Sequence, residues 1–376
     1  MKKLLLFLFI SYQSFGQMHA LYEPTYPTNQ SMLITPHGIS KGRVNNPGSN
    51  ISFGASSLSV NMTGNYNTAI GISTLSNLVD GSGNTAIGHS SMFNKTYGSD
   101  NTAVGFQSNY YGWNNHSNTA IGRNALFYNN GHMNVAVGKN ALYNNSVADE
   151  NVAVGNESLY NNWYGYYNTG IGSSTLFRTA KGYNTALGYR AGYANVGSHN
   201  TYLGHNADSN SEVYNSTAIG YGAIVDASNK VRIGNSAVNV IEGQVPWSNP
   251  SDRRLKENIT YTNRLGLDFI TRLQTVSYNY IADTNKTRYD GFIAQDVEKV
   301  MKDLGVSFSG LKKSADGTYS LAYSDFVMPL VNAVKEQQAK IERLEKQNQI
   351  LSASLAEIQE IRAELNRLRE SKDIGK

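Results

Sequence analysis

The sequence predicts a parallel β-solenoid over residues 51–240, followed by a more highly charged region and a long C-terminal helix. Three observations support this prediction. A short motif recurs at nearly constant spacing, the charge density rises near residue 250, and the last part of the chain follows a heptad pattern. Residues 1–250 hold 12 Lys/Arg and 10 Asp/Glu, whereas residues 251–376 hold 20 and 18, which places a domain boundary near residue 250.

The repeated motif has forms such as YNTAIG, DNTAVG and ENVAVG, and each copy ends in a glycine. From Gly54 to Gly220 successive motif glycines are 16 or 17 residues apart, and the step to Gly234 is 14. A second half-repeat, as in RNALFYNN, lies between the glycines, so each unit offers two short strands and two turns rich in Asn and Gly, which tolerate positive φ. Such a unit is too short for a strand plus a helix and fits one solenoid coil, stacked about 4.8 Å from the next.

The aliphatic residue before each motif glycine is expected to form a ladder inside the solenoid. Ile121 is one example, and the Thr or Val two residues earlier is expected to point to the same side. Because one coil buries little apolar surface alone, its neighbours must cover it.

The N-terminus has the pattern of a secretory signal peptide. Two lysines precede the apolar run Leu4 to Ile10, and small residues follow, so cleavage is expected near Gly16. This assigns residues 1–16 to the signal peptide and 17–50 to a linker, and it predicts a secreted or cell-surface protein without a transmembrane segment. The chain has no cysteine, so an exported fold must be held by core burial or by oligomerisation.

Composition excludes several classes of partner. The net charge of +4 on 376 residues argues against a nucleic-acid partner, and no pattern for a cofactor is present. The histidines follow no metal-ligand spacing, so no metal is expected; they include His89, His116, His132, His199 and His205. Of 25 tyrosines, 19 lie in the first 250 residues among many asparagines, which suits a surface that binds glycans or proteins but also suits turn and ladder positions.

A heptad pattern over residues 327–370 predicts an α-helical coiled coil. Spacings of three and four alternate throughout the expected seam, which consists of Val327, Leu330, Val334, Gln337, Ile341, Leu344, Asn348, Leu351, Leu355 and Ile358. The polar Gln337 and Asn348 within the seam could set its register and oligomer number.

The NTAIG units resemble the head of trimeric autotransporter adhesins over about residues 51–235. The resemblance implies that the solenoid is a left-handed parallel β-roll and that three identical chains pack side by side. It therefore implies a homotrimer, to which the heptad seam also points.

The segments SDRRLKENI and GFIAQDV and the terminal helix resemble the intramolecular chaperone domain of the S74 peptidase family, found at the C-termini of tailspikes and endosialidases. The resemblance covers about residues 251–350, and we assign an α+β chaperone domain to 241–326. It implies that the domain assists trimerisation of the fibre before it and then cuts itself off through a Ser–Lys dyad.

The candidate catalytic residues are Ser251 as nucleophile and Lys256 as its base. The last histidine of the chain is His205, so a Ser–His–Asp triad within the domain is excluded, and a Ser–Lys pair is a known alternative. Asp252 could orient the lysine or cap a helix. Arg253 and Arg254 could lower the pKa of the lysine or point to solvent.

Attack of Ser251 on the preceding carbonyl would break the Pro250–Ser251 bond. The activity would be that of an autocatalytic serine peptidase acting once, in cis, and favoured by proximity. The alternative is an uncleaved structural fibre whose C-terminal domain acts only as a trimerisation module. A protease acting on other chains is disfavoured, because no further domain remains to build its pocket.

Overall fold

The computed structural model describes residues 32–35, 38–41, 50–60, 63–179, 181–194, 197–281, 283–314 and 317–373. The predicted signal peptide, residues 1–16, and most of the linker, 17–50, lie outside these residues. The chain divides into two compact units, residues 1–236 and 237–376. Each unit is described here by itself. In the first, β1 (Met32–Thr35) and β2 (Gly38–Lys41) form an antiparallel pair ahead of the solenoid strands.

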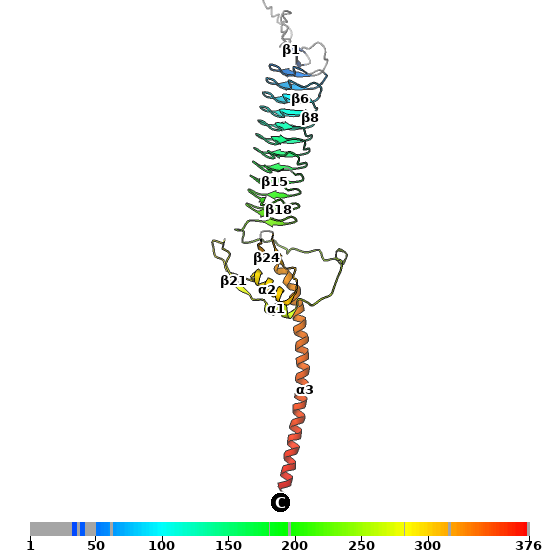
Figure 1. The fold of residues 1–376 in the computed structure, drawn as a ribbon, viewed down its shortest axis with the longest axis vertical. Helices are drawn as coiled ribbons and strands as arrows, with labels where there is room; N and C mark the ends of the chain where they lie inside the picture. Colours follow the sequence, from blue (N-terminus) through cyan, green and yellow to red (C-terminus); the bar gives the residue numbers. More distant parts are fainter. Residues whose placement is uncertain are drawn as a thin grey trace, which may run out of the picture. The chain divides into compact units, whose positions relative to one another are not determined.

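Two parallel sheets run along the solenoid, and Figure 1 shows its stacked coils. The longer sheet has twelve strands, which follow one another in chain order: β3 (Ile51–Phe53), β4 (Thr68–Ile70), β5 (Thr85–Ile87), β7 (Thr102–Val104), β9 (Thr119–Ile121), β11 (Val135–Val137), β13 (Val152–Val154), β14 (Thr169–Ile171), β15 (Thr185–Leu187), β16 (Thr201–Leu203), β18 (Thr217–Ile219) and β20 (Val231–Ile233). The shorter sheet contains β6 (Asn94–Tyr97), β8 (Tyr111–Asn114), β10 (Tyr128–Asn129) and β12 (Asn144–Asn145), and β17 (Asp208–Ser209) pairs with β19 (Ile224–Val225). A parallel β-solenoid is therefore confirmed.

The interior of the coils differs from the expectation at one position. In β9 the middle residue, Ala120, is completely buried, while Ile121 is 40% exposed. Successive side chains of a strand alternate between its faces, so only one of these two can point inward. The prediction that the aliphatic residue before each glycine lines the interior is wrong. The inward column is made mostly of alanine: Ala69, Ala86, Ala103, Ala120, Ala136, Ala153, Ala186 and Ala218.

The motif glycine ends each of these strands because the backbone there adopts a conformation that side chains disfavour. Gly122 has φ of 130°, and a Cβ at this position would lie 2.6 Å from the carbonyl oxygen of Gly138 in the next coil. Four residues later the chain places a buried leucine or methionine into the core at most coils: Leu58, Leu75, Met92, Leu126, Leu142, Leu159 and Leu176. Small inward residues and tight turns therefore produce a narrow coil.

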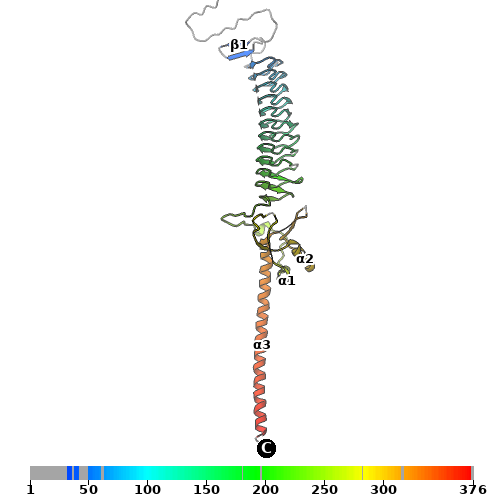
Figure 2. The ribbon, with the colours of Figure 1, turned by 90° about the vertical axis from the view of Figure 1, so that its left-hand side faces the viewer.

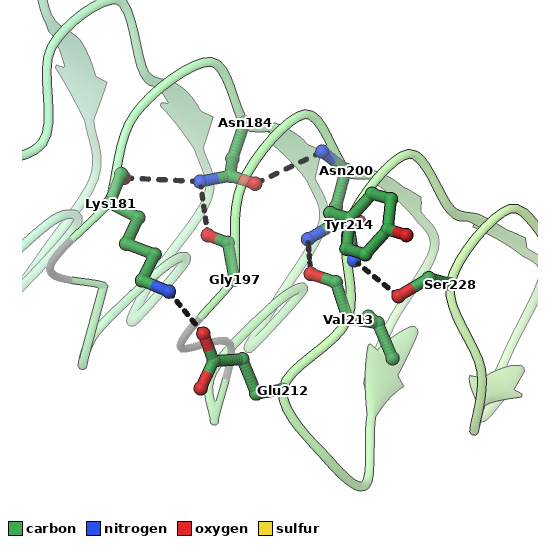
Figure 3. Close-up of polar contacts among 8 residues, drawn as sticks. All are labelled: Lys181, Asn184, Gly197, Asn200, Glu212, Val213, Tyr214 and Ser228. Carbon is green, nitrogen blue, oxygen red and sulfur yellow. Dashed lines mark hydrogen bonds and ion pairs between the residues drawn. The ribbon is translucent and has the colours of Figure 1, made fainter.

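A ladder of buried asparagines connects the coils and satisfies backbone groups in the turns. The Asn184 side chain accepts a hydrogen bond from the Asn200 backbone N–H (3.0 Å) and donates to the carbonyl oxygen of Gly197 (3.0 Å), as Figure 3 shows. Asn200 donates in turn to the carbonyl oxygen of Val213 (2.9 Å). The ladder comprises Asn67, Asn84, Asn101, Asn118, Asn134, Asn151, Asn168, Asn184 and Asn200. Each coil is thus bonded through side chains as well as backbone.

The second unit contains a small α+β region. Its elements are η1 (Arg253–Leu255), α1 (Leu267–Arg272), the antiparallel pair β21 (Val276–Tyr278) and β22 (Tyr289–Gly291), α2 (Ala294–Leu304), the antiparallel pair β23 (Leu311–Lys313) and β24 (Tyr319–Leu321), η2 (Tyr323–Phe326) and α3 (Val327–Asp373). Phe269, Val297, Phe308 and Phe326 form its buried core. Helices α1 and α2 and the hairpin β23–β24 thus share one small hydrophobic cluster.

Helix α3 has 47 residues, and Figure 2 shows it extending past α1 and α2. Its first turns belong to the small domain: Ala333 is buried, as is Phe326 of η2 directly before the helix. Beyond that, the side chains described along the helix are almost all exposed, including the predicted seam residues Ile341 and Leu351. A single helix confirms the expected secondary structure here, and the seam faces solvent in one chain.

Candidate functional site

The predicted cleavage site lies in an exposed stretch at the start of the second unit. Residues 237–252 form no regular helix or strand, and every one of them is exposed. Pro250 and Ser251 belong to this stretch, so the bond between them is open to attack. Regular structure begins directly afterwards with the short 3-10 helix η1.

The turn of η1 brings the two predicted catalytic side chains together. The backbone N–H of Lys256 donates to the carbonyl oxygen of Arg253 (3.1 Å), which folds the chain back towards Ser251. The Lys256 Nζ then lies 2.6 Å from the Ser251 Oγ and donates a hydrogen bond to it. A nucleophile and a base at this separation have the geometry that proton transfer requires.

Asp252 caps η1 and does not contact Lys256. Its Oδ1 accepts from the backbone N–H of Arg254 (2.8 Å), and its carboxylate pairs with the Arg254 guanidinium (2.6 Å). Hydrogen bonds from the Arg254 side chain, and then from its backbone, lower the pKa of Asp252. Of the two roles that the sequence left open for Asp252, the geometry shows the capping role.

The Ser251–Lys256 pair is exposed to solvent in a single chain. A lysine acts as a base only as the neutral amine, and removal from water or a nearby cation favours that form. Arg254 is held by Asp252, and among the described residues the side chain of Arg253 forms no hydrogen bond or ion pair with either member of the dyad. The pair is therefore assembled geometrically but is not enclosed.

A second set of contacts, which the sequence did not suggest, joins the long helix to the small domain. The Glu336 carboxylate on α3 accepts a hydrogen bond from the Leu267 N–H at the start of α1 (2.9 Å). Asn332 donates to the carbonyl oxygen of Leu265 (3.2 Å). In each of these two hydrogen bonds the partners are almost seventy positions apart in the sequence, so no local sequence pattern could reveal the contact. It fixes the first turns of α3 to the domain that carries Ser251.

The other candidate sites add no catalytic centre. Within the described residues, no cluster of His, Asp or Glu side chains could hold a metal ion. No helix in that part of the chain is long and apolar enough to cross a membrane. His116 and His132 stack on each other in neighbouring coils, with 5.4 Å between ring centroids, and so occupy ladder positions.

Comparison with known proteins supports the assignment of the C-terminal unit. Residues 251–306 match the family model of peptidase S74, described as the chaperone of endosialidase. The match begins at Ser251 and ends just after α2. A search of curated proteins finds no match for the chain.

Proposed function

We propose that this chain is an exported trimeric fibre whose C-terminal domain acts as an intramolecular chaperone and then releases itself by cleavage before Ser251. The S74 match at residues 251–306, next to a β-solenoid, supports the chaperone role. On this proposal the solenoid is a left-handed β-roll of the trimeric autotransporter adhesin type. Residues 51–240, 241–326 and 327–370 are its head, chaperone domain and coiled coil.

The solenoid carries an aliphatic stripe that one chain leaves uncovered. The aliphatic stripe is formed by the residue before each motif glycine, including Ile70, Ile87, Ile121, Ile171, Leu187, Leu203 and Ile233, each between 36% and 46% exposed. Its length along the whole head makes it a continuous apolar surface, which in soluble proteins marks an interaction site.

A second apolar surface follows the coils in parallel. The aromatic ladder consists of Phe93, Tyr110, Phe127, Tyr143, Tyr160, Phe177 and Tyr193, whose stacked rings have centroids 4.9 to 5.4 Å apart. A closed ring of three identical chains needs two different surfaces on each chain, because every contact is head-to-tail around the axis. The aliphatic stripe supplies one such surface, and the part of the aromatic ladder from Tyr160 to Tyr193, which does not include the rings that contact Tyr128, supplies the other.

The exposed heptad seam of α3 supports the same oligomer. Leu344, Leu351 and Leu355 are 47%, 59% and 51% exposed in one chain. A helix of this length without tertiary cover gains most of its stability by packing an apolar face against other helices. Three copies of α3 in a coiled coil would bury the seam and hold the three chaperone domains beside one another.

The trimer is tested by sedimentation of the full chain and of two variants. Wild type should sediment as a trimer at micromolar concentration. Ile121→Asp should weaken assembly, because it places a charge within the aliphatic stripe, yet each chain should keep its solenoid signal in circular dichroism. Ile72→Asp is the matched control. Ile72 is 54% exposed and directly follows a motif glycine, a position that holds a charged residue, Arg123 or Lys139, in two other coils. A wild-type monomer would refute the proposal.

Cleavage would proceed in two steps. The Lys256 amine takes the proton of Ser251 Oγ, and the oxygen attacks the carbonyl carbon of Pro250. The Pro250–Ser251 C–N bond breaks, the Ser251 nitrogen leaves as a protonated amine, and an ester joins Pro250 to Oγ. Water then hydrolyses this ester, which leaves a carboxylate on Pro250 and a free Ser251. Burial of the exposed dyad by neighbouring chains would supply the neutral lysine, so that cutting follows assembly.

Intact-mass measurement of purified protein tests this step. Wild type should yield a fragment that starts at Ser251, whereas Ser251→Ala and Lys256→Ala should remain whole and still form trimers. Arg253→Ala is the control, because the Arg253 side chain forms no hydrogen bond or ion pair with the dyad among the described residues, and the variant keeps the backbone carbonyl that accepts from the Lys256 N–H. A wild-type chain that stays intact after trimerisation would favour the uncleaved structural fibre. Normal cutting by Lys256→Ala would remove the lysine from its proposed role.

A further inference from the structure

The shorter solenoid sheet carries a column of tyrosines that stops abruptly. The rings of Tyr111 and Tyr128 stack with centroids 5.0 Å apart and planes 7° from parallel. On the next strand, the residue in register with Tyr128 is Asn144. Tyr111 therefore covers one face of the Tyr128 ring, and among the described residues no parallel ring continues the column; the Tyr143 ring of the next coil contacts Tyr128 only at an angle of 84°, with centroids 5.7 Å apart.

A half-open cavity of about 280 Å³ lies at this point. Its lining combines aromatic rings with uncharged polar side chains: Tyr111, Tyr128, Asn129, Asn130, Asn144, Ser146 and Trp163. Small-molecule sites have mostly apolar walls and a few polar groups, and start at roughly 300 Å³, so this cavity is of the size that admits one small ring. The lining includes no charged residue.

Several polar atoms at the cavity are free to bind a ligand. Asn144 uses its Nδ2 to donate to Asn161 (2.8 Å), and Asn130 uses its Oδ1 to accept from the Trp113 N–H (3.1 Å). Among the described residues, no hydrogen bond engages the Asn144 Oδ1, the Asn130 Nδ2 or the Ser146 Oγ. The site thus offers an acceptor, a donor and a hydroxyl that can act as either.

Trp113 extends the aromatic surface beyond the cavity. It lies two residues after Tyr111 in β8, on the same side of the strand, and is 68% exposed. Its backbone contact with Asn130 keeps it beside the cavity. Trp163 is 48% exposed and belongs to the lining of the cavity.

We propose that this surface, the tyrosine groove, binds a neutral glycan, with one sugar ring stacked on the open face of Tyr128. A sugar ring presents a face of C–H groups to an aromatic ring, and its hydroxyls both donate and accept, which matches the three free polar atoms. Nucleic acids and acidic glycans need cations that the lining lacks. The inference deepens the proposed exported fibre, whose head would meet external glycans, but it does not depend on cleavage.

The test uses the full-length protein on an array that carries neutral gluco-, manno-, galacto- and N-acetylglucosamine oligosaccharides together with sialylated and sulfated ones. Wild type should bind a subset of the neutral glycans. Tyr128→Ala and Trp163→Ala should each weaken that binding at least about tenfold, and Asn144→Ala should weaken it as well. Tyr221→Ala is the control: Tyr221 is 65% exposed and lies in a coil far from the groove.

Three results would overturn the inference: no neutral glycan is bound, only acidic glycans are bound, or binding survives both Tyr128→Ala and Trp163→Ala. Sedimentation of the same samples shows whether the protein is a trimer, and so distinguishes a failed glycan proposal from a failed trimer proposal. A trimer that binds no neutral glycan refutes the tyrosine groove alone. Circular dichroism of each variant confirms that a loss of binding does not arise from a lost fold.

Discussion

Replacing one residue of the asparagine ladder should destabilise the solenoid by an amount that the contacts define. Asn134 is completely buried. Its Oδ1 accepts from the backbone N–H of Asn151 (3.0 Å), and its Nδ2 donates to the carbonyl oxygen of Ala148 (2.9 Å). In Asn134→Ala the Asn151 N–H loses its acceptor, whereas the Ala148 carbonyl oxygen still accepts from the Asn145 Nδ2 (2.7 Å).

The expected loss follows from the Asn151 N–H, which is left without an acceptor. A buried polar group without a partner costs roughly 1–3 kcal/mol, so the free energy of unfolding should fall by about 1–3 kcal/mol. The other partners are affected less, because Asn118 Oδ1 still accepts from the Asn134 backbone N–H (2.9 Å) and Asn151 Nδ2 still donates to Asp149 (3.0 Å).

Equilibrium urea unfolding followed by circular dichroism measures the loss, and hydrogen exchange at the Asn151 amide measures it locally. Asn156→Ala is the control, because Asn156 is exposed and its side chain forms no hydrogen bond among the described residues; its effect should stay within about 0.5 kcal/mol. If Asn134→Ala unfolds with the same midpoint as this control, the ladder does not hold the coils together as argued.

Three further predictions concern the coil interior. Asn109 is buried in the column of leucines, and neither polar atom of its side-chain amide forms a hydrogen bond among the described residues. Asn109→Leu should therefore raise the urea midpoint and increase the free energy of unfolding by about 1–3 kcal/mol; a lower midpoint would contradict this. Burial lowers the pKa of Lys95 well below its ordinary 10.5, so at pH values between the two the unfolded chain binds a proton that the folded chain does not. The free energy of unfolding should therefore rise with pH towards 10.5, and Lys95→Met should remove that rise relative to wild type. Ala120→Asp should abolish folded protein, because it buries an unpaired charge, whereas Ile121→Asp should affect assembly; equal yields of folded chain would refute the assigned directions.

The period of the sequence predicted the coils, but it did not predict their inner face. Glycine spacing alone is enough to define the repeat, because a stacked coil must return to the same turn each time. Whether Ala120 or Ile121 points inward depends on the width of the coil, which the sequence pattern does not reveal. Hydrophobicity alone favoured the larger residue, Ile121, for the interior. Tyr202 takes the place of an alanine in the inward column and is completely buried. The coil accommodates its ring next to Gly192, where a Cβ would lie 2.8 Å from the ring.

The candidate site was predictable where its contacts are local. Ser251 and Lys256 are five residues apart, and a single turn of helix accounts for their meeting. The role of Asp252 stayed open because a carboxylate at this position can cap a helix or contact a cation, and only the folded structure shows the pairing with Arg254. The contact between Glu336 and α1, and the open face of Tyr128, arise from tertiary packing and leave no trace in local sequence.

Because the register between coils does not change, each coil adds the same length to the solenoid. Thr85 pairs with Thr102, Thr102 with Thr119, and each coil contacts the next in the same way, so no residue at one end senses how many coils separate it from the other. Gain or loss of one repeat alters the length of the solenoid by about 4.8 Å and leaves both ends chemically intact. The length of the solenoid can therefore change in uniform increments without any change in the sequence of the C-terminal unit.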